Sequence, residues 1–513
     1  MQQNKPRLMS FKEWVPDASR FWIYILFLIA FQFSNGMYFT AMGQMAGSLS
    51  LTMNDVKMMG AAVLIGLTMF FTLAFRLKFR FPNQTCLIIA ALGLALCNLI
   101  VPYIQSTPAL VVICFIAGFL RLFGTFECFS SILPKIAPTH NYAVFLSFVF
   151  FVVLGVIHVF DILSTYIIYY YNWHYVHRLA IALMLCVTLG AIVFMRPFRA
   201  MPKLLLYGVD WLGMVLWSIF ILSLIFVAQY GEQLDWLHST YIRVALGAST
   251  LALAANVWRM NNIRHPFLEL AAFKVRNLLQ LLVLFLLMDV LLSAQTVLQN
   301  TYTSAILHFD HLNSANLEWF EFIGMALGAL FSWQAITRLQ LPHKLLTFMG
   351  MSFIVAYLIM MYFLISPATN IEKLYFPQIC CGFGHVTIFI SLTVYAQATV
   401  PFKNYFQVLT VLGLIRTGIA APLGDAIYER AMSGFMSKHL ALIGSDTNIV
   451  FSGIGAETLH ATSLLSTLQE LFGWSVIFGV AVLIAIAGSR YKDRIRKPIP
   501  TLMALYKMAL RKA

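Results

Sequence analysis

The sequence predicts an all-α polytopic membrane protein with fourteen membrane-spanning helices. Three observations support this fold class. Apolar residues make up 60% of the 513 residues and charged residues only 11%, whereas a soluble domain has about 45–50% and about 25%. Fourteen apolar stretches are long enough to cross a hydrocarbon core about 30 Å thick. Lys and Arg residues gather in alternate connecting segments, as is typical of cytoplasmic loops.

The orientation follows from the positions of the basic residues. With a cytoplasmic N-terminus, 26 Lys and Arg residues fall in cytoplasmic segments, 6 on the opposite side, and Arg121 and Arg416 within spans. This asymmetry predicts an even number of crossings and two cytoplasmic termini. Residues 1–20 lack the features of a cleaved signal peptide, so the first stretch is expected to be a retained helix. The predicted spans are 21–47, 56–75, 85–104, 108–131, 142–168, 176–195, 207–229, 241–258, 277–302, 315–336, 344–366, 374–399, 404–428 and 471–489.

The spans suggest two halves with an insertion between them. We expect an N-terminal six-helix bundle over 1–200, a two-helix insertion over 201–262, a C-terminal six-helix bundle over 263–490 and a basic cytoplasmic tail over 491–513. Within the second bundle, a glycine-containing outer loop is expected at about 430–470. The basic tail is expected to lie on the inner leaflet as a topology anchor, with a regulatory role as the alternative.

The cysteine residues predict neither disulfides nor a metal site. All 7 lie within predicted spans, and no Cys/His spacing resembles a known metal-binding pattern. The net charge of +14 comes from residues that flank the spans, so we interpret it as a determinant of topology and not as a nucleic-acid surface.

Five local patterns occur in order along the chain. They are FSNGMYFTAMGQMAGSL at 33–49, NWHYVHR at 172–178, GVDWLGMVLWSIFILSLIFVAQYGEQLDW at 208–236, HPFLELAAFKVRN at 265–277 and LIRTGIAAPLGDAIYER at 414–430. On these residues the chain resembles the major facilitator superfamily, specifically its fourteen-helix drug:proton antiporter (EmrB/QacA-like) branch. The resemblance implies two six-helix bundles that surround a central cavity, with two inserted helices between them.

The chain departs from the pattern of that branch at three places. The first-helix Asp of the branch falls on Ser34, with Asn35 beside it. After the second helix, the basic residues Arg76 and Arg80 remain, but the acidic residue of the branch does not. In the fifth helix, Asp161 stands where the branch has Pro. The proton-coupling residues of the branch therefore cannot all be carried over to this chain.

Ionisable residues inside the first-half spans are candidate functional groups, because a charge at a helix centre costs about 2.5–3.5 kcal/mol. Arg121 is expected to hold an acidic partner or to respond to a nearby protonation. The alternatives for it are a structural pair with Glu127 and a snorkelling side chain. Glu127 lies six residues further on and hence on another face, so it is expected to reach water or another helix. Asp161 and His158, three residues apart, are candidates for a proton relay or a hydrogen-bonded pair.

In the second half, Asp289 is the first choice for a protonation or cationic-substrate site. It occupies the internal-repeat position of Asn35. His385 corresponds by repeat to the fourth-helix region and is a cavity candidate, with a structural hydrogen bond as the alternative. Arg416 and Asp425 are candidates for gating or helix packing, as are Arg76 and Arg80.

Two further acids, Glu318 and Glu321, lie close to the outer end of the tenth predicted span. We expect both of them to reach interfacial water.

These features predict a secondary active transporter that exports amphipathic or lipophilic small molecules by alternating access coupled to proton influx. No catalytic residue, metal or organic cofactor is expected, and no nucleotide-binding glycine-rich loop occurs in the sequence. The expected surroundings are the lipid bilayer of a bacterial inner membrane. A periplasmic adaptor and an outer-membrane channel are partners that the resemblance implies.

Three other functions remain open. The first keeps the fold but transports a specific metabolite or lipid-like solute without proton antiport. The second is a polytopic membrane enzyme, which would need an interfacial His/Asp or paired-carboxylate cluster that the loops lack. The third is a receptor or scaffold, which buried charges in both halves disfavour.

Overall fold

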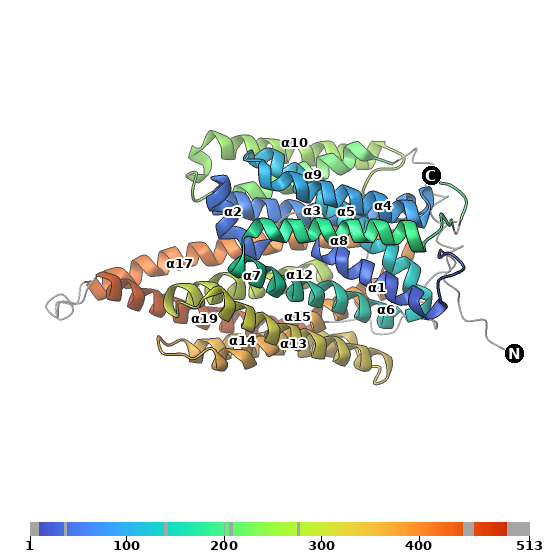
Figure 1. Ribbon diagram of the computed structural model, residues 1–513. Coiled ribbons are helices and arrows are strands. Elements are labelled where there is room, and N and C mark those ends of the chain that lie inside the picture. The colour runs from blue at the N-terminus through green and yellow to red at the C-terminus, as the bar shows by residue number, and fades with distance from the viewer. Residues whose placement is uncertain are drawn as a thin grey trace. The chain divides into compact units, whose positions relative to one another are not determined.

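The computed structural model describes residues 10–34, 38–137, 142–199, 201–204, 209–273, 277–444 and 456–489. In this part of the chain nearly all ordered residues are helical, which confirms the all-α fold class (Figure 1). Contacts between residues divide the chain into two compact units. The first contains the described residues of Met1–Gln280 and Ala396–Ile419, and the second contains those of Leu281–Tyr395 and Ala420–Arg494.

The first unit contains the helices up to α11 and a later helix, α16. Its elements are α1 (Asp17–Phe33), η1 (Phe39–Ala41), α2 (Met42–Leu49), α3 (Met53–Arg80), α4 (Asn83–Ile100), η2 (Val101–Tyr103), α5 (Thr107–Ile136), α6 (Tyr142–Phe150), η3 (Phe151–Gly155), α7 (Val156–Tyr170), α8 (Trp173–Phe194), α9 (Trp211–Tyr230), η4 (Trp236–His238), α10 (Thr240–Asn262), α11 (Leu270–Phe273) and α16 (Phe402–Ile415). The elements η1, η2 and η4 are 3₁₀ helices, and η3 is a π-helix.

The second unit contains most of α12 (Leu278–Ser293), the π-helices η5 (Ala294–Gln299) and η6 (Tyr302–Ile306), α13 (His311–Thr337), α14 (His343–Leu364), most of α15 (Glu372–Thr399), α17 (Ala421–Gly444) and α19 (Ala456–Gly488). The chain passes from one unit to the other within α12, within α15 and within the π-helix η7 (Arg416–Ala420). Residues 396–419 thus pack with the N-terminal helices. The bundles 1–200 and 263–490 stay a prediction.

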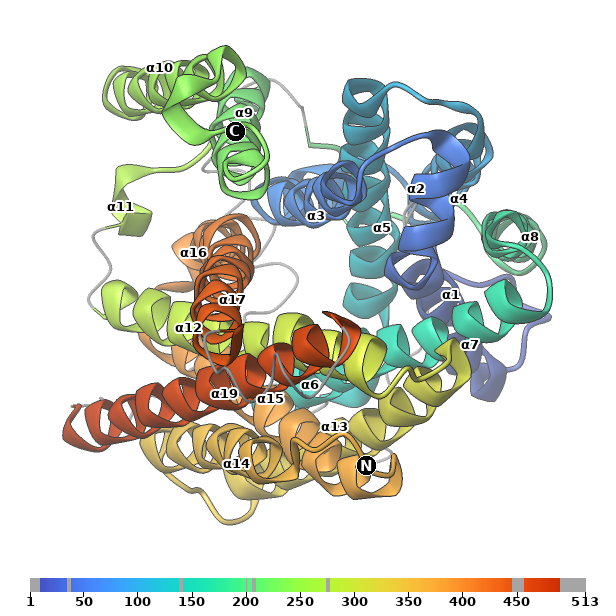
Figure 2. The ribbon, with the colours of Figure 1, turned by 90° about the vertical axis from the view of Figure 1, so that its left-hand side faces the viewer.

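Glycine pairs bring one pair of helices into close contact in each unit. In the first unit, a Cβ atom added at Gly66 of α3 would lie 2.0 Å from the carbonyl oxygen of Phe115, and one at Gly118 of α5 would lie 1.9 Å from that of Val63. Such distances leave no room for a side chain, so these glycines allow the two backbones to touch. The helices α3 and α5 run side by side as a result (Figure 2).

The second unit repeats this arrangement between α13 and α15. A Cβ atom at Gly324 would lie 2.2 Å from the carbonyl oxygen of Ile379, and one at Gly382 would lie 2.2 Å from that of Glu321. Each unit thus contains a helix pair fixed by reciprocal glycines.

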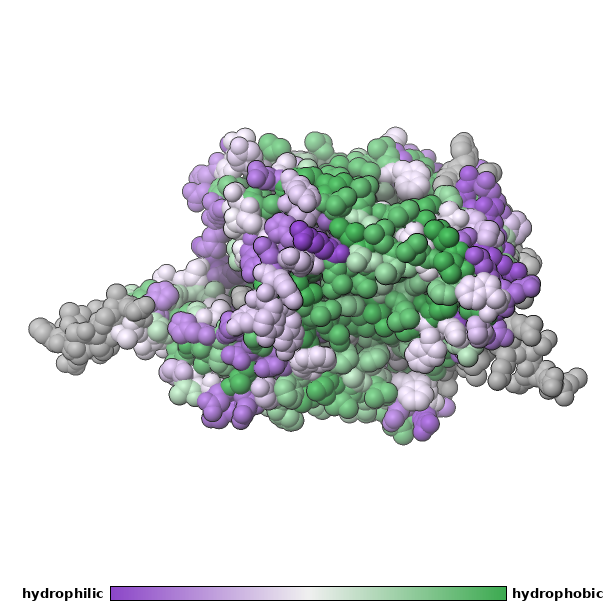
Figure 3. Space-filling model, viewed as in Figure 1, coloured by the Kyte–Doolittle hydropathy of each residue, from purple (hydrophilic) through white to green (hydrophobic). Residues whose placement is uncertain are grey.

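The surface of the first unit shows the apolar residues expected of helices that face lipid. Over α4, α8 and α9, apolar side chains form a band, and polar residues lie at both ends of it (Figure 3). Twelve helical stretches in the described part of the chain are long and apolar enough to cross a membrane. Helix α1, with 17 residues, and α10 are not among them. The predicted count of fourteen and the cytoplasmic termini therefore stay predictions.

The first predicted span and both ends of the predicted outer loop differ from the structure. The first predicted span, 21–47, is interrupted, because α1 ends at Phe33 and Ser34 leaves the helical conformation (φ −84°, ψ 91°). The predicted outer loop at 430–470 is largely helical, since α17 extends to Gly444 and α19 begins at Ala456. Its glycines were misleading: Gly434 lies inside α17 with open space around it.

Candidate functional site

Buried ionisable and polar side chains form clusters inside apolar helices of both units. In the first unit, the ammonium group of Lys78 on α3 lies 3.1 Å from Oε2 of Glu127 on α5. Lys78 also donates to Oγ of Ser130 at 2.5 Å, and Oγ of Ser131 donates to Glu127 at 3.2 Å. Both charged side chains are buried. The carboxylate is thus neutralised by one cation and further stabilised by a hydroxyl group, which a buried charge requires.

Sequence reasoning missed the role of Lys78. It lies in a run of basic residues that the topology count assigned to a cytoplasmic loop. In the structure, α3 continues to Arg80, and the side chain of Lys78 turns into the unit. Glu127 was expected to find water or another helix, and its partner does come from another helix. A basic residue one turn inside a long apolar helix, together with an acid on a second helix, was the available signal.

Arg121 lies in the same helix as Glu127 but in a different cluster. Its guanidinium group donates to Oε1 of Gln32 at 2.7 Å, and Nε2 of Gln32 donates to Oγ1 of Thr125 at 3.0 Å. Asp161 of α7 is close enough to interact electrostatically with Arg121. The structure therefore brings together Arg121 and an acidic residue from another helix, and the functional role of Arg121 stays a prediction.

The second unit has a cluster of amides around one carboxylate. Nε2 of Gln295, in the π-helix η5, donates to Oε2 of Glu321 at 2.6 Å and to Oε1 of Gln378 at 3.2 Å. The thiol of Cys381 donates to Oε1 of Gln295 at 3.1 Å. Glu321 is 4% exposed, so the expectation that it reaches interfacial water is wrong. The reason is that α13 packs its acid against η5 and α15 rather than turning it outward.

Two further side chains of the π-helix η5 form hydrogen bonds with other helices of the second unit. Gln299 accepts a hydrogen bond from the hydroxyl group of Tyr357 at 2.6 Å, and Thr296 donates to Oδ1 of Asp425 at 2.9 Å. A π-helical turn changes the phase of the residues that follow it and often occurs at functional sites. The segment that follows Asp289 is therefore the most polar part of its helix.

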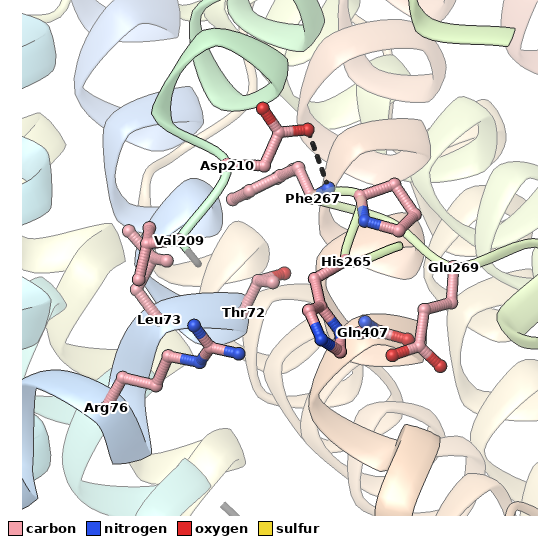
Figure 4. Close-up of a pocket in the computed structure, with 10 residues that line it drawn as sticks. Thr72, Leu73, Arg76, Val209, Asp210, His265, Phe267, Glu269 and Gln407 are labelled. Atoms are coloured by element: carbon pink, nitrogen blue, oxygen red, sulfur yellow. Dashed lines mark hydrogen bonds between the residues drawn. The ribbon is translucent and has the colours of Figure 1, made fainter. Parts of the chain in front are cut away.

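A small pocket lies in the first unit beside the inserted helices (Figure 4). Its volume is about 50 Å³, which has room for water molecules but not for a drug-sized solute. Residues from α3, from the segment before α9, from the segment after α10 and from α16 line it: Thr72, Leu73, Arg76, Val209, Asp210, His265, Pro266, Phe267, Glu269 and Gln407.

Asp210 joins the elements around this pocket. It caps α9 by accepting from the backbone nitrogen of Gly213 at 2.8 Å and forms an ion pair with Arg259 of α10. It also accepts from the backbone nitrogen of Phe267 at 3.1 Å (Figure 4). Arg76 lines the pocket and interacts electrostatically with Glu269. The pocket is thus part of the attachment of the inserted helices.

The structure places the other predicted site residues as follows. Asp289 is buried in α12, and His158 is half-buried in α7. His385 is half-buried in α15, where its ring packs near Phe389. Arg416 begins the π-helix η7. Their roles in coupling, binding or gating stay predictions.

Arg80 donates to the carbonyl oxygen of Leu204 at 3.5 Å, and its predicted role in gating or helix packing stays a prediction. Asn35 and the basic tail lie outside the described residues.

Comparison with known proteins identifies the fold. No family model matches the chain, and no curated protein matches its sequence. Solved structures do match. A structure described as an auto-inhibited POT family peptide transporter is 14% identical, with a TM-score of 0.53, and the match covers 93% of this chain and 98% of the other. The chain therefore shares the fold of this peptide transporter.

Two further structures agree with this assignment. A point mutant of the nucleoside transporter NupG is 12% identical, with a TM-score of 0.55, and the match covers 90% of this chain and 98% of NupG. Tetrameric PepTSo2 is 12% identical, with a TM-score of 0.54 and coverage of 97% and 99%. With its apolar helices, the fold makes this chain an integral, multi-pass membrane protein. None of these structures is described as a drug:proton antiporter, so the predicted branch stays a prediction.

Proposed function

We propose that this protein is a secondary active transporter that exports amphipathic or lipophilic small molecules by alternating access coupled to proton influx. The observation that carries the proposal is the carboxylate of Glu321, which is buried in a membrane-length apolar helix and hydrogen-bonded by Gln295. An amide neighbour can serve both states of the acid, because it donates to a carboxylate and its oxygen accepts from a carboxylic acid. Such a group can take up and release a proton during a transport cycle.

In this proposal the two units have different roles. In the first unit, the carboxylate of Glu127 forms an ion pair with Lys78. The second unit holds Glu321 among amides and a thiol. We therefore assign proton coupling to Glu321 together with Asp289, and a positioning role to the Lys78–Glu127 pair. Arg121 and Asp161 are the corresponding candidates of the first unit.

The proposal also specifies the setting of the protein. It operates in a bacterial inner membrane with fourteen spans and cytoplasmic termini, and it needs a proton gradient but no cofactor. A periplasmic adaptor with an outer-membrane channel would receive its substrate in double-membraned bacteria.

Proteoliposomes test the proposed function. The purified protein is reconstituted with ethidium as an amphipathic cationic probe, and its flux is measured with and without an imposed pH gradient. We expect ethidium to move against the proton flow and to stop accumulating when a protonophore is added. Flux that is the same with and without the gradient would exclude proton antiport.

One observation favours a second function, the transport of a specific metabolite or lipid-like solute without antiport. At the position of the first-helix acid of the drug:proton branch, this chain has Ser34, which is buried and accepts a hydrogen bond from Asn98 at 2.9 Å. If ethidium is not transported while a panel of lipid-like solutes is, and if that flux ignores the pH gradient, this second function replaces the first.

A further inference from the structure

Asn98 of α4 is the centre of a buried hydrogen-bond network in the first unit. Its Nδ2 atom donates to the carbonyl oxygen of Leu94 at 3.0 Å and to Oγ of Ser34 at 2.9 Å. Its Oδ1 atom lies 3.1 Å from the hydroxyl group of Tyr38 and 3.1 Å from Nδ1 of His177, on α8. Ser34, Tyr38, Asn98 and His177 are all buried.

This network determines which nitrogen of His177 carries the proton. A backbone carbonyl oxygen can only accept a hydrogen bond, so the atom of Asn98 that faces Leu94 must be the amide nitrogen. The other atom, Oδ1, is then an acceptor that faces His177. Nδ1 of His177 must therefore be the protonated nitrogen, because an acceptor needs a donor. In the neutral ring, Nε2 is left with a free lone pair.

The surroundings of this lone pair are closed. The His177 ring is 1% exposed and makes edge-to-face contacts with Tyr38 and Trp173, with ring centroids 5.1 Å and 5.5 Å away. Among the described residues, none offers a hydrogen bond to Nε2. A buried acceptor without a donor costs free energy. This cost indicates that Nε2 binds a ligand that cannot reach it in the closed packing.

We propose that Nε2 of His177 is a proton-binding site, empty in the packing described here and filled when that packing loosens and water enters. The inference rests on the proposed function, since it assigns a second proton site to the same transport cycle. A proton is the ligand that needs no added volume beside a covered nitrogen. The neutral ring fits the closed cluster, whereas an imidazolium would place an additional charge among apolar side chains.

The described residues packed around His177 include two titratable groups. The titratable neighbours are the hydroxyl group of Tyr38, from the segment before α2, and the ring of His174, one turn earlier on α8. Asn98 on α4 and Ser34, directly after the end of α1, are neutral. The apolar cluster around Trp173 is completed by side chains of α7 and α5, namely Phe160, Ile168 and Cys114.

This arrangement sets the direction of the pH effect. The loosened state binds one more proton than the closed state, so acid favours the loosened state and alkali favours the closed one. The predicted orientation places the start of α8 at the outer face. A low outer pH would therefore hold this end of the first unit open while the solute leaves, as proton-driven export requires.

Two variants distinguish loss of the base at Nε2 of His177 from loss of the hydrogen bond between His177 and Asn98. His177→Asn keeps an amide N–H where Nδ1 donates to Asn98 but removes the base at Nε2. His174→Gln changes the neighbouring, more exposed ring on the same helix and is the matched control. We expect ethidium flux in proteoliposomes to rise as the outer pH falls through about 8 to 5 for the wild type and His174→Gln. The rise for His177→Asn should be smaller, because this variant keeps only the proton sites of the second unit.

The outcomes distinguish this inference from the proposed function. If the wild type shows no pH-dependent flux, the proposed proton coupling fails. If the wild type is pH-dependent and His177→Asn keeps the same profile, the proton site at His177 is wrong. A second readout does not need transport: ¹⁵N NMR of histidine-labelled protein, with His177 assigned by its loss in His177→Asn. At neutral pH we expect the proton on Nδ1, and a proton on Nε2 overturns the inference.

Discussion

Lys78 and Glu127 form an ion pair between α3 and α5 with a distance of 3.1 Å from Nζ to Oε2, and their side chains are only 7% and 1% exposed. The same two helices are held together by Gly66 and Gly118. A charged pair and a backbone contact thus fix one interface in two chemically different ways. Both can be tested separately, because the residues lie at different heights of the helices.

Removing one partner of the ion pair should destabilise the protein more than removing both. Lys78→Met leaves the Glu127 carboxylate buried without its cation, which we expect to lower the free energy of unfolding by about 3–5 kcal/mol. The double variant Lys78→Met with Glu127→Leu should recover most of this loss. Unfolding of the detergent-solubilised protein measures all the variants of this cycle. A double variant that is as unstable as the sum of the two single variants would show that the pair has no special role.

A side chain at Gly66 should separate α3 from α5. Gly66→Ala would place a methyl group 2.0 Å from the carbonyl oxygen of Phe115, and we expect a loss of about 1–3 kcal/mol because the backbones must move apart. Gly247→Ala in α10 is the control, since nothing lies within 4 Å of its added Cβ atom. That change should be neutral or stabilising by up to about 1 kcal/mol, as expected for alanine in a helix. Equal thermal midpoints for the two variants would contradict the close contact.

Neutralising Glu321 should uncouple transport from the proton gradient. In Glu321→Gln the hydrogen bond to Gln295 can persist while the proton site is lost. We expect gradient-driven accumulation of ethidium to fall by about 5–150-fold, the usual range of coupling between two sites. Gradient-independent exchange of ethidium should remain. Glu372→Gln, at an exposed acid in the first turn of α15, is the control and should transport like the wild type. An unimpaired Glu321→Gln variant would remove Glu321 from the coupling mechanism.

The crossing of α10 decides whether fourteen spans is the correct count. Helix α10 has 23 residues but is less apolar than the twelve stretches that qualify as candidate spans. In a cysteine-free background, we expect Ser239→Cys to react with a membrane-impermeant maleimide from outside the cell. Asn262→Cys should react only after the membrane is permeabilised. Labelling of both positions from the same side would mean that α10 does not cross the membrane.

The sequence was sufficient for the helical fold because long apolar stretches leave few alternatives in a bilayer. It also located Arg121 and Asp161, whose side chains interact in the structure, because charges inside apolar helices are conspicuous. Helix ends were less certain. The predicted span ended at 428, where polar residues begin, whereas α17 continues to Gly444. A helix keeps its backbone hydrogen bonds in water, so it can extend beyond its apolar residues.

The partners of the buried residues could not be obtained from the sequence. Lys78 was counted as a loop residue and Glu321 as an interfacial one, since the distance of each from a span end appeared small. Their burial depends on which helices pack together, a property that hydropathy does not report. His177 lies in the NWHYVHR pattern at 172–178 but was not singled out, because an isolated histidine near a helix start usually faces water.

Proton movement driven by a solute gradient tests the central claim most directly. Proteoliposomes are loaded with ethidium and a pH-sensitive dye and diluted into medium without ethidium, with no pH gradient imposed. If the protein exchanges solute for protons, the departure of ethidium must acidify the lumen, and a protonophore must abolish the acidification. Ethidium that leaves through the protein with no change in lumenal pH would contradict the account.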